Sequence, residues 1–190
     1  MERKISSETL PVNIYTDGAC SGNQNEFNTG GWGAVLEYGE YRKEIHGGEK
    51  NTTNNRMEIL ALIAALDELK KPGQLVRVFS DSSYLMNCFR QKWYEKWRTN
   101  GWKNSKKAPV ENRDLWERLL VFLDVHDFRF YLIKGHINPN AKNISLTTFY
   151  EKFKAHNGDS FTYDDFLYIV KMNNRADELA NEGIAENRTI

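Results

Sequence analysis

The chain has 190 residues, with 26 basic and 26 acidic side chains and 40% hydrophobic residues. This length suits a single domain spanning 1–190, and the balanced charge excludes any prediction of a partner from net charge, so a binding surface must come from local clustering. Two cysteines exclude a disulfide framework and favour a reducing compartment. Because no stretch approaches the ~18 apolar residues of a membrane span and the N-terminus lacks the apolar run of a signal peptide, we expect a cytoplasmic protein without membrane association.

The first half of the chain has the patterns of three strands, one helix and a fourth strand. Apolar and polar residues alternate in the strand-like segments, whereas the helix-like segment is rich in Ala and Leu and is closed by Pro72-Gly73. The predicted elements are a strand at 12–18 that ends at Asp17, a hairpin at 32–48 with its turn at Gly39-Glu40, a helix from about 54 to 70, and a strand at 75–81.

The second half combines helical patterns with one further strand. Its predicted elements are a helix that begins at 82, an amphipathic helix at 111–126, a strand at 128–136, helix-like stretches around 145–155 and 162–171, and a helix at 173–187. Strands separated by helices favour parallel pairing, with the helices covering the sheet. The sequence therefore predicts an α/β fold in which three antiparallel strands are followed by two parallel ones.

Four acids stand out, because two end predicted strands and two lie in predicted first turns of helices. Each has a local structural interpretation. Asp17 suits a turn, and Asp81 suits a helix cap. Glu58 and Asp177 each follow an asparagine by three residues, as in a capping box.

Together, these acids support another interpretation, since strand ends and helix starts lie at the same edge of such a sheet. Four carboxylates close together repel one another and need a hard cation to remain ionised. Mg²⁺ binds carboxylate oxygens while keeping waters or phosphate oxygens as further ligands. A pair of such ions about 4 Å apart can activate a water and stabilise the leaving oxygen of a phosphoryl group. The four acids therefore indicate chemistry on phosphodiesters.

Six motifs occur in the order typical of one family: YTDGACSGN, TTNNRMEI, FSDSSY, WKNSKKAPVENRDLW, KGH and NNRADELA. They resemble type 1 ribonuclease H of the bacterial ribonuclease HI kind. The resemblance implies a five-stranded mixed sheet flanked by helices, and a metal-dependent endonuclease that hydrolyses the RNA strand of RNA/DNA hybrids by two-metal-ion cleavage. It implies two Mg²⁺ ions, with Mn²⁺ as a substitute, bound by Asp17, Glu58, Asp81 and Asp177. His136 matches a histidine that assists proton transfer and product departure, although alone it could be an ordinary exposed side chain.

The resemblance also implies contacts with both strands of a hybrid duplex. Amide and backbone groups suit the 2′-hydroxyl, which both donates and accepts hydrogen bonds. Two positions depart from the family: Asn51 stands where an arginine often joins the phosphate pocket, and Ser83 stands where a longer amide often reaches the RNA. The implied contacts are Cys20, Asn23, Asn54, Asn55 and Ser83 for the RNA strand, Trp93 for a DNA sugar, and Thr53 with Asn112 for a DNA phosphate.

Residues 88–114 form a basic and aromatic segment, with eight basic and three acidic side chains and three tryptophans. One interpretation is a solvated helix pair in which Trp93 and Trp97 pack against each other. The other is a surface that follows a nucleic-acid backbone, with cations on phosphates and a ring against a sugar. The resemblance identifies about 90–112 as a basic protrusion that grips the DNA strand, in which Trp97 and Trp102 form a small core of their own.

Forty residues separate His136 from Asp177, a longer span than the family usually has. This predicted insertion, about 138–172, contains four basic and four acidic side chains, so it is no obvious nucleic-acid arm. Thr162 with Asp165 resembles a capping box. The favoured interpretation is a helical hairpin that covers a hydrophobic patch, and the alternative is a lid that controls access to the site.

Two other functions fit parts of the pattern. A hybrid-binding module of the same fold without catalysis is opposed by the complete set of acids, because a pure binder does not need clustered carboxylates near phosphates. Another metal nuclease of the same fold, such as an integrase or exonuclease, agrees less well with the TTNN motif and the basic segment. No obligatory protein partner is evident, and we expect a monomer that binds an RNA/DNA hybrid duplex.

Overall fold

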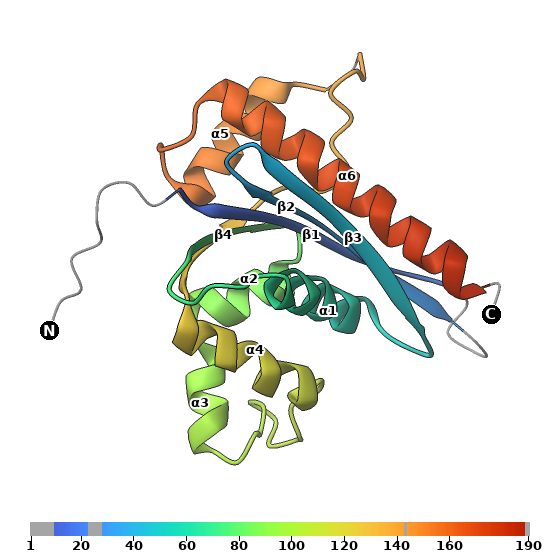
Figure 1. The fold of residues 1–190 in the computed structure, drawn as a ribbon, viewed down its shortest axis with the longest axis vertical. Coiled ribbons are helices and arrows are strands. Elements are labelled where there is room, and N and C mark those ends of the chain that lie inside the picture. The colour runs from blue at the N-terminus through green and yellow to red at the C-terminus, as the bar shows by residue number, and fades with distance from the viewer. Residues whose placement is uncertain (1–9, 23–27, 143, 189–190) are drawn as a thin grey trace, which may run out of the picture.

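Figure 1 shows the computed structural model, which describes residues 10–22, 28–142 and 144–188. Its centre is a five-stranded sheet in the order β3-β2-β1-β4-β5. β2 and β3 are the predicted hairpin and join at the predicted turn, residues 39–40. The strands β1, β2 and β3 pair antiparallel, whereas β4 is parallel to both β1 and β5, which confirms the predicted mixed sheet. The strands are β1 (Val12–Ser21), β2 (Thr29–Tyr38), β3 (Tyr41–Lys50), β4 (Leu75–Ser80) and β5 (Asp127–Leu132).

The ends of two strands differ from the prediction. β1 does not stop at Asp17 but continues to Ser21, because its antiparallel pairing with β2 extends as far as the pair Ser21 and Thr29. Its parallel pairing with β4 ends one residue before Asp17. β5 ends at Leu132, which pairs with Ser80 at the end of β4, so the residues up to 136 form a loop and not a longer strand.

The helices of the described residues cover both faces of the sheet (Figure 1). α1, α2 and α4 lie on one face, with α3 beyond them, and α5 and α6 lie on the other. Side chains that alternate along the strands divide the core accordingly: Ile14 and Val78 pack toward α1 and α4, whereas Tyr15 and Phe79 pack toward α5 and α6. Within the described ranges, no helix is both long and apolar enough to cross a bilayer. The helices are α1 (Asn54–Asp67), α2 (Ser83–Arg90), α3 (Trp93–Thr99), α4 (Arg113–Val125), α5 (Leu146–Asn157) and α6 (Tyr163–Arg188).

α6 is one continuous helix of 26 residues, whereas the sequence indicated two separate helices at 162–171 and 173–187. No glycine or proline interrupts the stretch where the two would meet, and Phe166, Ile169 and Asn173 are buried at spacings of three and four residues. The predicted capping box is present at its start: Thr162 N donates to Asp165 Oδ2 at 2.7 Å, and Asp165 N donates to Thr162 Oγ1 at 3.1 Å.

α5 covers the outer edge of β5. Asn157, the last residue of α5, donates to the Leu132 carbonyl at 2.7 Å and accepts from the Leu132 backbone N–H at 2.9 Å. These bonds satisfy groups that an edge strand otherwise leaves unpaired. Phe153 is buried against Phe161 and Phe166, in the same cluster as Phe79 of the sheet. The helix therefore covers a hydrophobic patch and has a fixed position beside the end of β5.

Candidate active site

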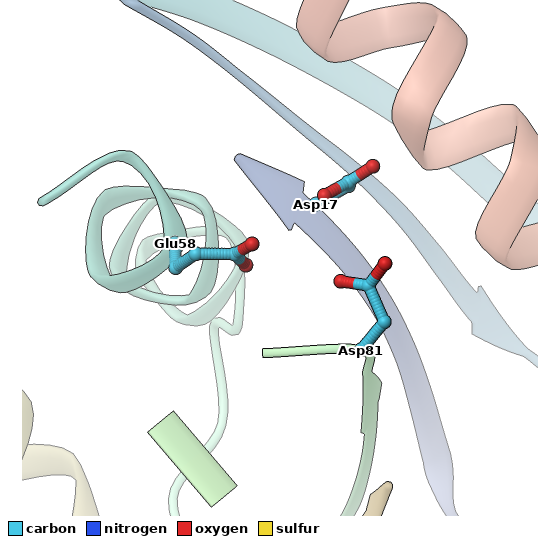
Figure 2. Close-up of side chains that lie close together, drawn as sticks. All are labelled: Asp17, Glu58 and Asp81. Carbon is cyan, nitrogen blue, oxygen red and sulfur yellow. The ribbon is translucent and has the colours of Figure 1, made fainter. Parts of the chain in front are cut away.

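Asp17 and Asp81 lie side by side because the parallel strands β1 and β4 are in register. The last parallel pair joins Thr16 to Ser80, and each aspartate is the next residue along its chain. Glu58 reaches the same point from α1, and Figure 2 shows the three carboxylates pointing toward one another. One carboxylate oxygen from each residue lies within 4.8 Å of the other two. The structure therefore brings three of the four predicted acids together where the parallel pairing of the central strands β1 and β4 ends.

The start of α1 aims Glu58 at this cluster. Thr53 is the N-cap, and its hydroxyl accepts from the Arg56 backbone N–H at 3.2 Å. The predicted capping box between Asn55 and Glu58 is therefore wrong, because Glu58 lies five residues after the cap. Gly18 allows β1 to approach the helix closely, since a Cβ at that position would overlap the backbone nitrogen of Glu58.

Asp81 has no capping role either, so its carboxylate is left for the cluster. Ser82 is the N-cap of α2, and its hydroxyl accepts from the Leu85 backbone N–H at 3.2 Å. Gly135, in the loop after β5, lies against the carboxylate, and a Cβ there would overlap Asp81 Oδ2. The loop that leads to His136 therefore forms a wall of the site, and any larger residue at 135 would have to displace the Asp81 carboxylate.

Burial and mutual repulsion raise the pKa of all three carboxyl groups. Burial, followed by the charges of Asp81 and Asp177, raises the pKa of Asp17 to about 8. Burial and the charge of Asp17 raise the pKa of Glu58 well above its ordinary value. Burial also raises the pKa of Asp81, although the nearby His136 opposes that effect. The metal-free cluster therefore resists carrying its full negative charge at neutral pH.

The donor set fits a divalent metal ion. Among the residues that the structure describes, Glu58 Oε2 is one of three buried side-chain atoms without a hydrogen-bond partner. A buried, unpartnered carboxylate oxygen is unfavourable unless a cation or a water binds it. Hard cations such as Mg²⁺ bind carboxylate oxygens and offset the repulsion between neighbouring acids.

Asp177 comes from the middle of α6 and not from a first helical turn, so the capping box predicted from Asn174 is wrong. α6 begins at Tyr163, fourteen residues earlier, because the apolar spacing of the insertion continues into the last helix. Asp177 is not one of the three acids within 4.8 Å of one another. Its Oδ2 lies 3.7 Å from His136 Nδ1, and its charge is among the causes that raise the pKa of Asp17. Asp177 therefore stands at the rim of the cluster, beside the predicted histidine.

His136 lies on a loop that α6 holds in place. The Asn174 amide donates to the carbonyl of Ile137 at 2.8 Å, and His136 has a left-handed backbone conformation with φ of 54°. Its side chain is 74% exposed and is therefore open to solvent. The sequence did not identify Asn174 as a positioning residue, because no local pattern reveals a partner 37 residues away.

The residues predicted to contact RNA lie close to the cluster in the chain. Asn54 and Asn55 are exposed in the first turn of α1, and Ser83 is the exposed first residue of α2. Cys20 is half-buried on β1, and burial raises the pKa of its thiol. Asn23 lies outside the described residues. Three of these side chains are therefore open to a ligand.

Arg56 connects the two residues predicted to bind a DNA phosphate. Its backbone N–H donates to Thr53, and its Nη1 lies 3.5 Å from Asn112 Oδ1. Its guanidinium also donates to Glu49 at 2.9 Å and to Asp114 at 3.1 Å. No local pattern in the sequence gave Arg56 a functional role. Its partners Asn112, the N-cap of α4, and Asp114, in the first turn of α4, lie more than fifty residues away in the sequence.

Trp93 is half-buried at the start of α3, where its ring meets Trp97 edge to face at 6.4 Å. Its indole N–H donates to Gln91 at 3.0 Å. Trp97 is buried and lies 5.4 Å from the ring of Trp116 in α4. The tryptophans of this segment therefore continue the main core, and the prediction that Trp97 and Trp102 form a separate small core is wrong.

Comparison with known proteins places this site in a family. The family model for RNase H matches residues 9–146. The chain belongs to the RNase H family. Ribonuclease H of Acetivibrio thermocellus is 52% identical over 132 residues, which cover 70% of this chain and 87% of that protein. Ribonuclease H of Moorella thermoacetica is 56% identical over 132 residues, which cover 70% of this chain and 84% of that protein.

A solved structure agrees with this membership. LC9-RNase H1 is described as a type 1 RNase H with the type 2 active-site motif. It is 26% identical in sequence, and the structural match has a TM-score of 0.61 and covers 90% of this chain and 87% of that chain. The predicted family and fold are confirmed, and the chain is an endoribonuclease. The family match includes Asp17, Glu58, Asp81 and His136 but ends before Asp177, whose assignment rests on its motif and its place beside His136.

Proposed function

We propose that this chain hydrolyses the RNA strand of RNA/DNA hybrids, with two Mg²⁺ ions held by Asp17, Glu58, Asp81 and Asp177. The observation that carries the proposal is the convergence of three carboxylates, of which Asp17 and Glu58 are buried, where the parallel pairing of β1 and β4 ends, with an unpartnered oxygen on Glu58. Family membership supports ribonuclease H activity. A fourth acid at the rim supports a second ion, because three clustered carboxylates already suit the first.

When bound, the ions would activate a water and stabilise the leaving oxygen. The chain contributes rigid placement of their ligands. The sheet register holds Asp17 beside Asp81, and a core-packed helix holds Glu58. Because sheet pairing and core packing fix the backbone positions of these ligands, little backbone reorganisation is needed during the reaction. Mn²⁺ prefers the same oxygen ligands and can substitute.

His136 carries protons between the site and solvent. Its exposed imidazole lies 3.7 Å from Asp177, so it can deliver a proton to the leaving group or accept one from water while the acids hold the metal. The same position at the mouth of the site lets it assist departure of the cleaved product.

The hybrid contacts fall into two sets. Asn54 and Asn55, with Cys20, Asn23 and Ser83, contact the RNA strand, where amide groups can recognise the 2′-hydroxyl. Thr53 and Asn112 bind a DNA phosphate, with Arg56 fixing their separation, and Trp93 packs against a DNA sugar. The basic segment at about 90–112 adds cations along the DNA backbone.

The decisive experiment is a Mg²⁺ cleavage assay on one end-labelled RNA, presented single-stranded, paired with RNA and paired with DNA. We expect cutting of the DNA-paired RNA alone. Asp81→Asn should abolish cutting while hybrid affinity stays equal or improves, because one negative charge facing the phosphates is removed. Asp159→Asn, at an exposed position in the loop between α5 and α6, is the matched control and should cut normally.

Binding of the hybrid without cutting, even with Mn²⁺, would instead favour a non-catalytic hybrid-binding module. Loss of binding together with cutting in Asp81→Asn would count against its assignment as a metal ligand. A monomeric state and a cytoplasmic location stay predictions. The free Cys20 and Cys88 agree with a reducing compartment.

A further inference from the structure

A groove of about 370 Å³ lies between α5 and the loop after β5. We call it the α5 groove. Asp81 after β4, Ser83 at the start of α2 and His136 in the loop after β5 line one side of it. Lys152 and His156 of α5 line the other side. The helix contributed by the insertion therefore faces the same space as an acid of the catalytic cluster.

The polar rim of the α5 groove is basic. Lys134 and Lys152 are exposed and line it, and among the described residues that line it Asp81 is the one acid. Although the insertion has a balanced composition, Glu151 pairs with Lys154 at 2.9 Å and does not line the groove. Of the described Lys, Asp and Glu side chains of the insertion, Lys152 is the one that lines the groove, so the insertion adds a positive charge and no acid beside the catalytic cluster.

The rest of the lining suits the sugars of a nucleic-acid strand. Phe149, which is half-buried and packs against the cluster of the buried Phe153 and Ile133, provides an apolar surface next to the cations, and such a surface accepts the carbon face of a ribose while lysines reach the flanking phosphates. His156 Nδ1 lies 2.8 Å from the Lys152 carbonyl, which can only accept, so Nδ1 donates and Nε2 is left for a ligand.

We propose that α5 extends the substrate surface and binds the ribose-phosphate backbone of the RNA strand beside the cleavage point. Lys134 and Lys152 contact phosphates, and His156 contacts an adjacent phosphate or 2′-hydroxyl. This inference rests on the proposed function, which places the scissile RNA phosphate at the carboxylate cluster. The RNA strand is the occupant because the groove contains Asp81, whereas the proposed DNA-strand residues lie on α3 and at the starts of α1 and α4, across the sheet from α5 (Figure 1).

The test compares Lys152→Ala with Lys171→Ala, which removes the same charge from an exposed position of α6 that does not line the groove. On an RNA/DNA hybrid at low salt, Lys152→Ala should raise KM about three- to tenfold with kcat nearly unchanged. The slope of log Kd against log salt should fall by about 1. Lys152→Arg should restore both values, and Lys171→Ala should match wild type.

The strand is identified with hybrids that carry a neutral methylphosphonate at single positions. If Lys152 contacts an RNA phosphate, a methylphosphonate at one position of the RNA strand will remove the difference in KM between wild type and Lys152→Ala. Two results would overturn the inference in a wild type that cleaves the hybrid. The first is that a methylphosphonate in the DNA strand, and not in the RNA strand, removes the difference in KM. The second is that Lys152→Ala and Lys171→Ala give the same slope of log Kd against log salt. A wild type that cleaves no hybrid would overturn the proposed function and this inference together.

Discussion

Asp17→Asn should stabilise the metal-free protein while it abolishes catalysis. Asp17 is buried, and its pKa rises to about 8 through burial and the charges of neighbouring acids. In the unfolded chain the same carboxyl loses its proton near its ordinary value of 3.8. The native state therefore becomes less stable, relative to the unfolded state, as pH rises between these two values. An asparagine amide at this position is never charged. Its oxygen can still accept the hydrogen bond that the Gly18 N–H donates to Asp17 Oδ1 at 2.8 Å in the wild type.

The size of the effect follows from linkage. Each pH unit between the two pKa values lowers the free energy of unfolding of the wild type by up to about 1.4 kcal/mol. The pKa of Asp17 is raised by burial and in part by the neighbouring acids, which also lose that repulsion when Asp17 is replaced. We therefore expect Asp17→Asn to recover about half of the free energy of unfolding that this linkage gives. The variant should exceed wild type by about 1 kcal/mol near pH 5 and by about 2–3 kcal/mol near pH 8.

Urea unfolding in EDTA at several pH values measures this difference directly. Asp159→Asn, at an exposed position, is the control and should leave both stability and its pH dependence unchanged. Adding Mg²⁺ should narrow or invert the gap, because the ion stabilises the wild-type cluster by mass action and binds the variant weakly. A variant that is less stable than wild type near pH 8 in EDTA, or a gap independent of pH, would refute the reasoning.

Three further predictions concern the end of β5 and the loop after it. His136→Ala should lower kcat on the hybrid with little change in KM, because the exposed imidazole moves protons and does not hold the duplex; an unchanged kcat would remove it from the mechanism. Gly135→Ala should lower kcat and Mg²⁺ affinity together, because its Cβ would displace the Asp81 carboxylate, and wild-type values in calorimetry and turnover would contradict this. Asn157→Ala should lower the free energy of unfolding by about 1–3 kcal/mol in urea, since Leu132 loses both bonds; Asn140→Ala, at an exposed position, should not.

Local patterns in the sequence determined most of the elements and part of the site. Alternating apolar residues identify the strands, and the helical spacing of apolar residues identifies α1 and α4. Parallel strands bring their carboxyl ends to one edge, so the sequence alone was enough to predict that Asp17 and Asp81 lie together. The capping box of Thr162 and Asp165 was predictable because both partners lie within one helical turn.

Only the tertiary structure decided features that depend on contacts between distant residues. It merged two predicted helices into α6 and so placed Asp177 in the middle of a helix, because burial against the sheet supports helical structure throughout that stretch. It also joined Arg56 to α4 and Asn174 to the loop beside His136. The α5 groove also depends on contacts between distant residues, since the packing of α5 on β5 brings Lys152 and Lys134 together. Sequence periodicity specifies which face of an element is buried, but the partners of that face are chosen by the packing of the whole chain.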